Sequence, residues 1–133
     1  MIDLVFFYGT LMTPFNRTGR LRVDHHLLYQ GRGTIAGALF DVGIYPAAVP
    51  ASDAHVWGEV YRMAHPTIVL PVLAEFEGCR TDEPEASLYT RALTRVTLED
   101  GPAVDAWAYF YNAPLGRAER IPSGDYLQYL NSR

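Results

Sequence analysis

Two long strand-like runs joined by a tight turn constrain the fold of this 133-residue chain more than any other feature. Residues 88–99 and 103–112 are rich in β-branched and aromatic side chains, and Asp100-Gly101 lies between them. An Asp-Gly pair between two such runs is a strong indication of a β-hairpin, because glycine accepts the positive φ that a tight hairpin turn requires. The sequence therefore predicts an antiparallel pair of long strands in the C-terminal half of the chain.

Further strands are predicted from the hydrophobic pattern. Residues 2–8 are apolar at nearly every position and Gly9 ends the run, which is typical of a central strand covered on both faces. Residues 55–63 alternate in the manner of a strand with one buried face. We also expect strands at 34–42 and 47–50.

One helix is clearly indicated. It begins at Pro66 or Thr67, carries apolar residues at helical spacing, and ends at Gly78. Pro71 is expected in its first turn, where a missing N–H does little harm. Shorter helices are expected at 21–28 and 125–130. Since strands outnumber helices, the predicted class is α+β, a small mixed, barrel-like sheet with one or two flanking helices.

Composition narrows the kind of protein. Apolar residues make up 49% of the chain and charged residues 20%, which predicts one packed domain over residues 1–133. The net charge of −4 argues against a nucleic-acid partner. The single cysteine, Cys79, allows neither an internal disulfide nor a thiolate zinc cage. No apolar run approaches 18 residues and no basic leader opens the chain, so we expect a cytoplasmic protein that does not enter a membrane.

Two common site types are not supported by the sequence. Residues 31–36 (GRGTIA) match the loose dinucleotide pattern, but the residues that follow predict a strand, and the mechanism needs a helix there. His25 and His26 are neighbours that we expect to point apart, and no histidine pair has metal-ligand spacing. We therefore expect no nucleotide, cofactor or metal.

Glu77 is the first candidate for chemistry. It lies in the last turn of the apolar helix, where the negative end of the helix dipole and partial burial would both raise the pKa of its carboxyl. A glutamate with a raised pKa can accept and return a proton near neutral pH. The alternative is an exposed residue at a helix end, and the same choice applies to Glu75.

The glycine turn after the first strand is the second candidate. Tyr8, Gly9, Thr10 and Leu11 follow a buried central strand, and successive N–H groups in such a turn can bind an anion such as a substrate carboxylate. The alternative is a turn that only ends the strand.

These residues resemble a known family. Phe7-Tyr8-Gly9-Thr10-Leu11 is similar to the YGTL or YGSL motif of γ-glutamylcyclotransferase-like proteins, which include γ-glutamylamine cyclotransferases and the plant AIG2-like proteins. Further stretches agree in order along nearly the whole chain: GIYPA at 43–47, VWGEVY at 56–61, LAEFEG at 73–78, LYTR at 88–91, WAYFY at 107–111 and PSGDY at 122–126.

The resemblance implies a small mixed barrel with the YGTL loop lining a cavity. It implies that the carboxylate directly before glycine, Glu77 rather than Glu75, handles protons. The family's aspartate after the leucine is Ala74 here, and the segment 80–87 is longer and more acidic than expected.

The implied reaction closes a γ-glutamyl amide into 5-oxoproline and releases an amine, without a cofactor or metal. In this reading Glu77 is the general base and then the general acid. The N–H groups of Gly9, Thr10 and Leu11 hold the substrate's carboxylate or the developing oxyanion. Tyr109 donates its hydroxyl to the substrate, with Tyr111 as the next choice.

The sequence leaves other readings open. A module that binds a small acidic metabolite without turning it over could use the same scaffold, as could a structural interaction domain. The amine portion of the substrate and the oligomeric state are not predicted.

Overall fold

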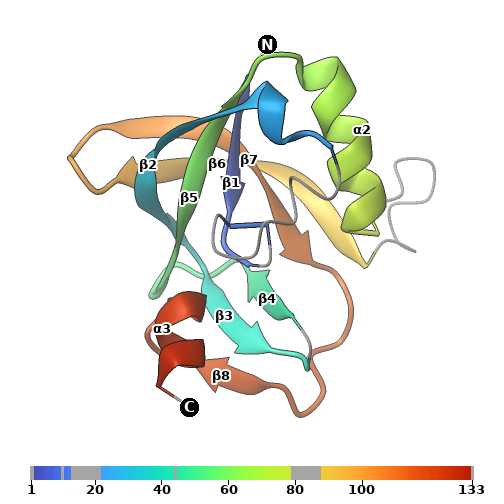
Figure 1. Cartoon of the computed structure of the whole chain (residues 1–133). Coiled ribbons are helices and arrows are strands. Elements are labelled where there is room, and N and C mark those ends of the chain that lie inside the picture. The colour runs from blue at the N-terminus through green and yellow to red at the C-terminus, as the bar shows by residue number, and fades with distance from the viewer. Residues whose placement is uncertain (1, 10, 13–21, 44, 79–87, 133) are drawn as a thin grey trace.

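A closed five-stranded barrel forms the centre of the molecule (Figure 1). The computed structural model describes residues 2–9, 11–12, 22–43, 45–78 and 88–132. Neighbouring barrel strands are antiparallel except β1 and β7, which are parallel where they close the barrel. The order around the barrel is β1 (Leu4–Phe7), β5 (His55–Met63), β2 (Leu27–Ala36), β6 (Tyr89–Leu98) and β7 (Ala103–Tyr111).

The predicted hairpin and the predicted central strand are confirmed. Strands β6 and β7 pair from Tyr89 opposite Tyr111 to Thr97 opposite Ala103, and Gly101 in the turn has φ of 118°. Strand β1 lies between β5 and β7, and its last three residues are buried. A strand with a neighbour on each edge and side chains buried on both faces needs the continuous apolar run that the sequence shows.

A second, three-stranded sheet lies below the barrel in Figure 1, in the order β4 (Pro46–Val49), β3 (Ala38–Asp41) and β8 (Glu119–Ile121). The short helix α3 (Tyr126–Asn131) packs beside this sheet, and the Tyr129 hydroxyl donates to the Asp41 carboxylate at 2.7 Å. Asp125 caps the helix by accepting the Gln128 N–H at 3.1 Å. The predicted α+β class with a barrel-like sheet is therefore confirmed.

Two predictions about residues 21–42 are wrong. The described part of 21–28 holds only a three-residue 3₁₀ helix, η2 (Asp24–His26), and β2 begins directly after it. Residues 34–42 are two strands in different sheets, because the chain leaves β2 at Gly37 and starts β3. The first half of β2 has no alternating pattern, since residues 28–30 are exposed and the register shifts by a bulge there.

The main helix, α2 (Pro66–Phe76), lies beside the barrel (Figure 1). Val69 and Leu73 are fully buried on the side that faces the barrel core. Pro71 lies in the second turn rather than the first, on an exposed part of the helix. The helix therefore tolerates one missing backbone hydrogen bond and still reaches the position that carries Glu77.

Candidate active site

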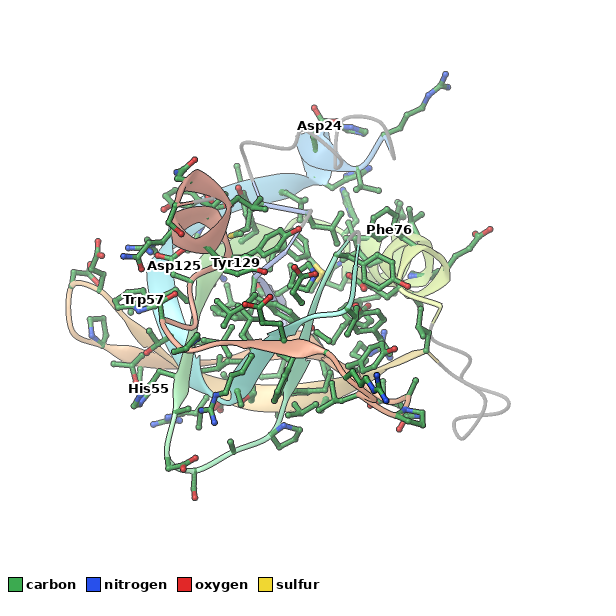
Figure 2. All side chains as sticks on the ribbon, turned by 90° about the horizontal axis from the view of Figure 1, so that it is seen from below. Asp24, His55, Trp57, Phe76, Asp125 and Tyr129 are labelled. Atoms are coloured by element: carbon green, nitrogen blue, oxygen red, sulfur yellow. The ribbon has the colours of Figure 1, made fainter. Side chains whose placement is uncertain are left out.

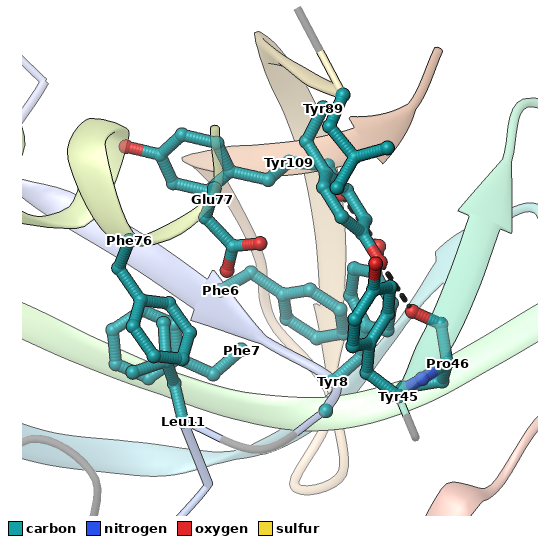
Figure 3. A pocket seen from close by; sticks show the side chains of 12 residues that line it. Phe6, Phe7, Tyr8, Leu11, Tyr45, Pro46, Phe76, Glu77, Tyr89 and Tyr109 are labelled. Carbon is teal, nitrogen blue, oxygen red and sulfur yellow. Dashed lines mark hydrogen bonds between the residues drawn. The ribbon is translucent and has the colours of Figure 1, made fainter. Parts of the chain in front are cut away.

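A cavity of about 300 Å³ opens between the end of α2, the glycine turn after β1 and the start of β4 (Figure 3). This volume is at the lower end of the range for small-molecule sites. Its described lining is mostly aromatic and apolar: Phe6, Phe7, Tyr8, Gly9, Leu11, Tyr45, Pro46, Phe76, Glu77, Leu88, Tyr89 and Tyr109. Glu77 and four of the five predicted substrate-binding residues thus share one chamber.

The end of α2 fixes the position of Glu77. Its N–H closes the last helical turn on the Leu73 carbonyl at 2.9 Å. Gly78 follows with φ of 64°, a left-handed conformation that ends the helix and suits glycine. The Gly78 carbonyl accepts the Leu88 N–H at 3.0 Å, so the helix end is tied to the start of β6. Figure 3 shows the Glu77 carboxylate pointing from this helix end into the cavity.

The environment of Glu77 changes its proton affinity. The residue is half-buried against the aromatic lining, and desolvation of the side chain there raises the pKa of its carboxyl from the ordinary 4.5 to about 7. No arginine or histidine is among the described residues that line the cavity, so nothing described there offsets the cost of desolvation. At neutral pH the group is poised between its protonated and ionised forms. Glu75 differs in being exposed and outside this lining.

The glycine turn meets the cavity at Gly9 and Leu11, and Thr10 lies outside the described residues. The Gly9 carbonyl accepts the Met12 N–H at 3.1 Å, which closes the turn. A Cβ added at Gly9 would lie 2.9 Å from Pro46 Cγ, closer than such atoms normally approach. Glycine is thus required here because the turn packs directly against β4.

Two tyrosine hydroxyls connect the barrel to β4. Tyr8 donates to the Tyr109 carbonyl at 2.6 Å and accepts the Ala48 N–H at 3.2 Å. Tyr89 donates to the Pro46 carbonyl at 2.8 Å. Burial raises the pKa of both phenols, and the nearby Glu77 carboxylate adds to this rise. Both groups therefore stay neutral, and their hydroxyls hold the cavity wall together while their rings line it.

The two tyrosines weighed for substrate contact differ in position. Tyr109 is buried and lines the cavity. Tyr111 is absent from the described lining, and its ring packs edge-on against Tyr89 with the centroids 5.3 Å apart. Of these two tyrosines, Tyr109 therefore lines the cavity and Tyr111 does not.

Sequence reasoning missed several lining residues as site residues. Tyr45 and Pro46 come from the GIYPA stretch, and Leu88 and Tyr89 come from the LYTR stretch. The resemblance quoted both stretches, so their order along the chain was a usable signal for these four positions. Phe6, Phe7 and Phe76 read as core residues, because nothing in an apolar run marks which side chain borders a cavity.

The remaining candidates lie away from the cavity. Residues 31–36 lie in β2 and the strand β3 follows them, so the chain does not form the helix that a dinucleotide site needs directly after this motif. The rings of His25 and His26 lie 4.0 Å apart rather than pointing apart, and His26 also contacts His65 at 5.3 Å. Among the described residues, no group of three or more His, Cys, Asp or Glu could hold a metal ion. Ala74 is half-buried outside the cavity lining, whereas Cys79 and the segment 80–87 lie outside the described residues.

Comparison with known proteins decides the family. A family model described as gamma-glutamyl cyclotransferase, AIG2-like, matches residues 5–128. The chain belongs to this family. It is 33% identical over 132 residues to the gamma-glutamylcyclotransferase family protein YtfP of Escherichia coli K12, covering 92% of this chain and 95% of that protein. No described helix is both long and apolar enough to cross a membrane.

Solved structures share the fold. The solution structure of YtfP from Escherichia coli aligns with a TM-score of 0.62 at 32% identity, covering 95% of this chain and 97% of that chain. The crystal structure of a mouse AIG2-like protein aligns with a TM-score of 0.71 at 22% identity, covering 93% and 88%. The predicted family is therefore confirmed. Membership in it supports an enzyme of the γ-glutamylcyclotransferase-like kind.

Proposed function

We propose that this protein cyclises a γ-glutamyl amide, releasing 5-oxoproline and a free amine, with Glu77 as the proton-transfer group. The observation that carries the proposal is one carboxylate with a pKa of about 7 inside the chamber that the glycine turn also lines. Family membership supplies the reaction class.

The chemistry needs little from the protein beyond placement and a proton carrier. The substrate's α-nitrogen attacks its own γ-carbonyl carbon, the new C–N bond closes a five-membered ring, and the bond to the leaving nitrogen breaks. Because nucleophile and electrophile belong to one molecule, holding the folded substrate removes much of the entropic barrier. The α-ammonium must lose a proton before attack, and the leaving nitrogen must gain one.

Glu77 can perform both transfers. In its ionised form it accepts the proton from the α-ammonium, and in its protonated form it donates to the leaving nitrogen. An unperturbed glutamate would be a weak base and would not hold the proton near neutral pH. Burial, by raising the pKa to about 7, brings both forms within reach.

The glycine turn is the proposed cradle for negative charge. Backbone N–H groups of Gly9, Thr10 and Leu11 would receive the α-carboxylate or the oxyanion that forms on the γ-carbonyl. The close approach of Gly9 to Pro46 leaves no room for a side chain beside this turn. Tyr109 lies on β7, the strand that pairs with β1 to close the barrel, and would donate its hydroxyl to the substrate.

The test is release of 5-oxoproline from a panel of γ-glutamyl amides and γ-glutamyl amino acids. We expect turnover of at least one compound by the wild-type protein and its loss in Glu77→Gln. Glu75→Gln removes an equivalent charge from the exposed side of the same helix end and should retain the wild-type rate. Binding of these compounds without consumption would replace the enzyme by a metabolite-binding module.

A further inference from the structure

Tyr89, the first residue of β6, joins the two parts of the proposed site. Directly before it, the Leu88 N–H donates to the Gly78 carbonyl at 3.0 Å, which connects this end of β6 to the residue after Glu77. The Tyr89 hydroxyl donates to the Pro46 carbonyl at 2.8 Å, at the start of β4 (Figure 3). The same end of β6 thus reaches the helix end with its backbone and β4 with a side chain.

Pro46 extends this connection to the glycine turn. A Cβ added at Gly9 would lie 2.9 Å from Pro46 Cγ and 3.2 Å from Pro46 Cδ, so the proline ring packs directly against Gly9. Both residues line the cavity. Because packed groups transmit small shifts to their neighbours, a displacement of Pro46 would also displace the backbone N–H groups that are proposed to receive negative charge.

The position of β4 depends on side-chain hydroxyls. Among the described strands, β4 lies at the edge of the small sheet and pairs with β3 alone. Pro46 and Ala48 are two residues apart, so their main-chain groups face the same edge of β4. Tyr89 donates to the Pro46 carbonyl, and Tyr8 accepts the Ala48 N–H at 3.2 Å. Two hydroxyls thus satisfy the edge that a neighbouring strand would otherwise satisfy, and they help to set where β4 lies against the barrel.

The ring of Tyr89 is held in one place. It is 5% exposed, and it lies against the rings of Tyr45 and Tyr111 with centroids 6.1 Å and 5.3 Å away. Burial raises the pKa of its phenol, so the hydroxyl keeps the proton that it donates to Pro46. Tyr89 is therefore a fixed, neutral donor.

Building on the proposed function, we infer that Tyr89 is a positioning residue for this reaction. Its hydroxyl acts through Pro46 and holds the glycine turn at the distance from Glu77 that the folded substrate spans. Proximity catalysis is sensitive to small misplacements, so one hydrogen bond outside the reacting atoms can affect the rate.

Removing the hydroxyl without the ring tests this role. Tyr89→Phe should weaken binding of 5-oxoproline, measured by isothermal titration calorimetry, by about five- to tenfold, the equivalent of one hydrogen bond. The kcat/KM for a γ-glutamyl amide should fall by the same factor. Tyr61→Phe removes a hydroxyl that donates to Glu59 at 3.0 Å, outside the described cavity lining, and should leave both values within about twofold. A hydrogen bond that only stabilises the fold would leave the affinity of folded Tyr89→Phe unchanged, and that result would overturn the inference.

A double variant tests whether the effect passes through Pro46. The Cβ introduced by Gly9→Ala forces Pro46 away from the turn, so adding Tyr89→Phe to Gly9→Ala should lower the affinity for 5-oxoproline by a further twofold at most, roughly. Losses that multiply in the double variant would mean that Tyr89 contacts the ligand itself, and they would overturn the positioning role.

The two proposals fail separately. Binding of 5-oxoproline without turnover of any γ-glutamyl amide would remove the cyclisation, and a loss of affinity in Tyr89→Phe would still support the positioning role. Turnover at the wild-type rate in Tyr89→Phe would remove the positioning role and leave the cyclisation intact. A wild-type protein that neither binds nor consumes these compounds would remove both.

Discussion

Two carboxylates next to the two described α-helices are held in opposite ways. Asp125, before α3, accepts hydrogen bonds from the Arg32 guanidinium and from the Gln128 N–H. Glu77, after α2, enters a chamber whose described lining holds no cation. Figure 1 shows the two helices far apart, with α2 near the N-terminus and α3 near the C-terminus.

Asp125 lies in a group of charged and aromatic side chains that join α3 to the barrel. Figure 2 shows Trp57 and Asp125 near each other, on the side away from Phe76. The Arg32 guanidinium lies 4.4 Å from the centre of the Trp57 ring and also reaches Glu99 at 3.5 Å. Asp125 pairs with Arg32 on β2 and caps α3, so its carboxylate connects the helix to the barrel. A carboxylate buried without a cation destabilises the fold instead, and the same desolvation raises the pKa of Glu77 to about 7.

Neutralising each carboxylate in turn should give the largest difference between Glu77 and Asp125. Glu77→Gln should lower kcat/KM for a γ-glutamyl amide by about 10²–10⁴-fold, the usual contribution of a general acid–base group. Asp125→Asn should leave it within about twofold, because its partners lie far from the cavity. Steady-state kinetics on both variants checks this, and a comparable loss in Asp125→Asn would erase the distinction.

The same substitution at residue 77 should raise stability in a pH-dependent way. Below pH 4.5 the carboxyl is protonated whether the chain is folded or unfolded. As pH rises from 4.5 to about 7 the unfolded chain ionises first, so the wild-type protein loses stability relative to Glu77→Gln. At pH 8 the variant should be more stable by up to about 3 kcal/mol, measured by urea unfolding. A variant that is less stable at pH 8 than at pH 4.5, relative to wild type, would contradict the burial of this charge.

Within the cavity wall, the buried Tyr8 hydroxyl should contribute to stability through its two hydrogen bonds. Tyr8→Phe leaves the Ala48 N–H and the Tyr109 carbonyl without the hydroxyl that now serves both. We expect a loss of about 2 kcal/mol in unfolding free energy, since buried polar groups left unsatisfied are costly. Tyr29→Phe, at a largely exposed ring on β2, is the control and should cost little. Equal losses would mean that the Tyr8 bridge contributes nothing of its own.

The smallest effect is expected at Asp125 itself. Asp125→Ala removes both the cap of α3 and the partner of Arg32, and should cost about 1 kcal/mol. Asp125→Asn loses the charge that pairs with Arg32 but keeps a capping oxygen, so it should cost less, and the difference between the two variants reports the cap. Thermal or urea unfolding resolves the order, and a larger loss for the asparagine variant would contradict the capping role.

The sequence predicts the elements that are determined by residues close together in the chain. Examples are the hairpin turn at Asp100-Gly101, the apolar run of β1, and the helical spacing of Val69 and Leu73. Strand β8 and the exposed start of β2 were missed, because their pairing depends on partners distant in sequence. A three-residue strand such as β8 carries too few residues to show a period.

The site divides in the same way. Glu77 was identified from its place before Gly78, a local feature that the resemblance to LAEFEG reinforced. The bridging role of the Tyr8 and Tyr89 hydroxyls could not be identified in this way. Each donates to a backbone carbonyl about 40 or more residues away, which only the tertiary fold brings near. Which phenylalanine faces the cavity is likewise decided by packing between β1 and α2.

The pH dependence of kcat/KM for a γ-glutamyl amide tests the role of Glu77 most directly. The ionised carboxylate must take the first proton, so the rate should rise with pH and level off above a midpoint of about 7. A rate that is flat between about pH 5 and 8, or whose midpoint lies near 4.5 as for an exposed glutamate, would contradict a buried Glu77 as the group that moves the proton.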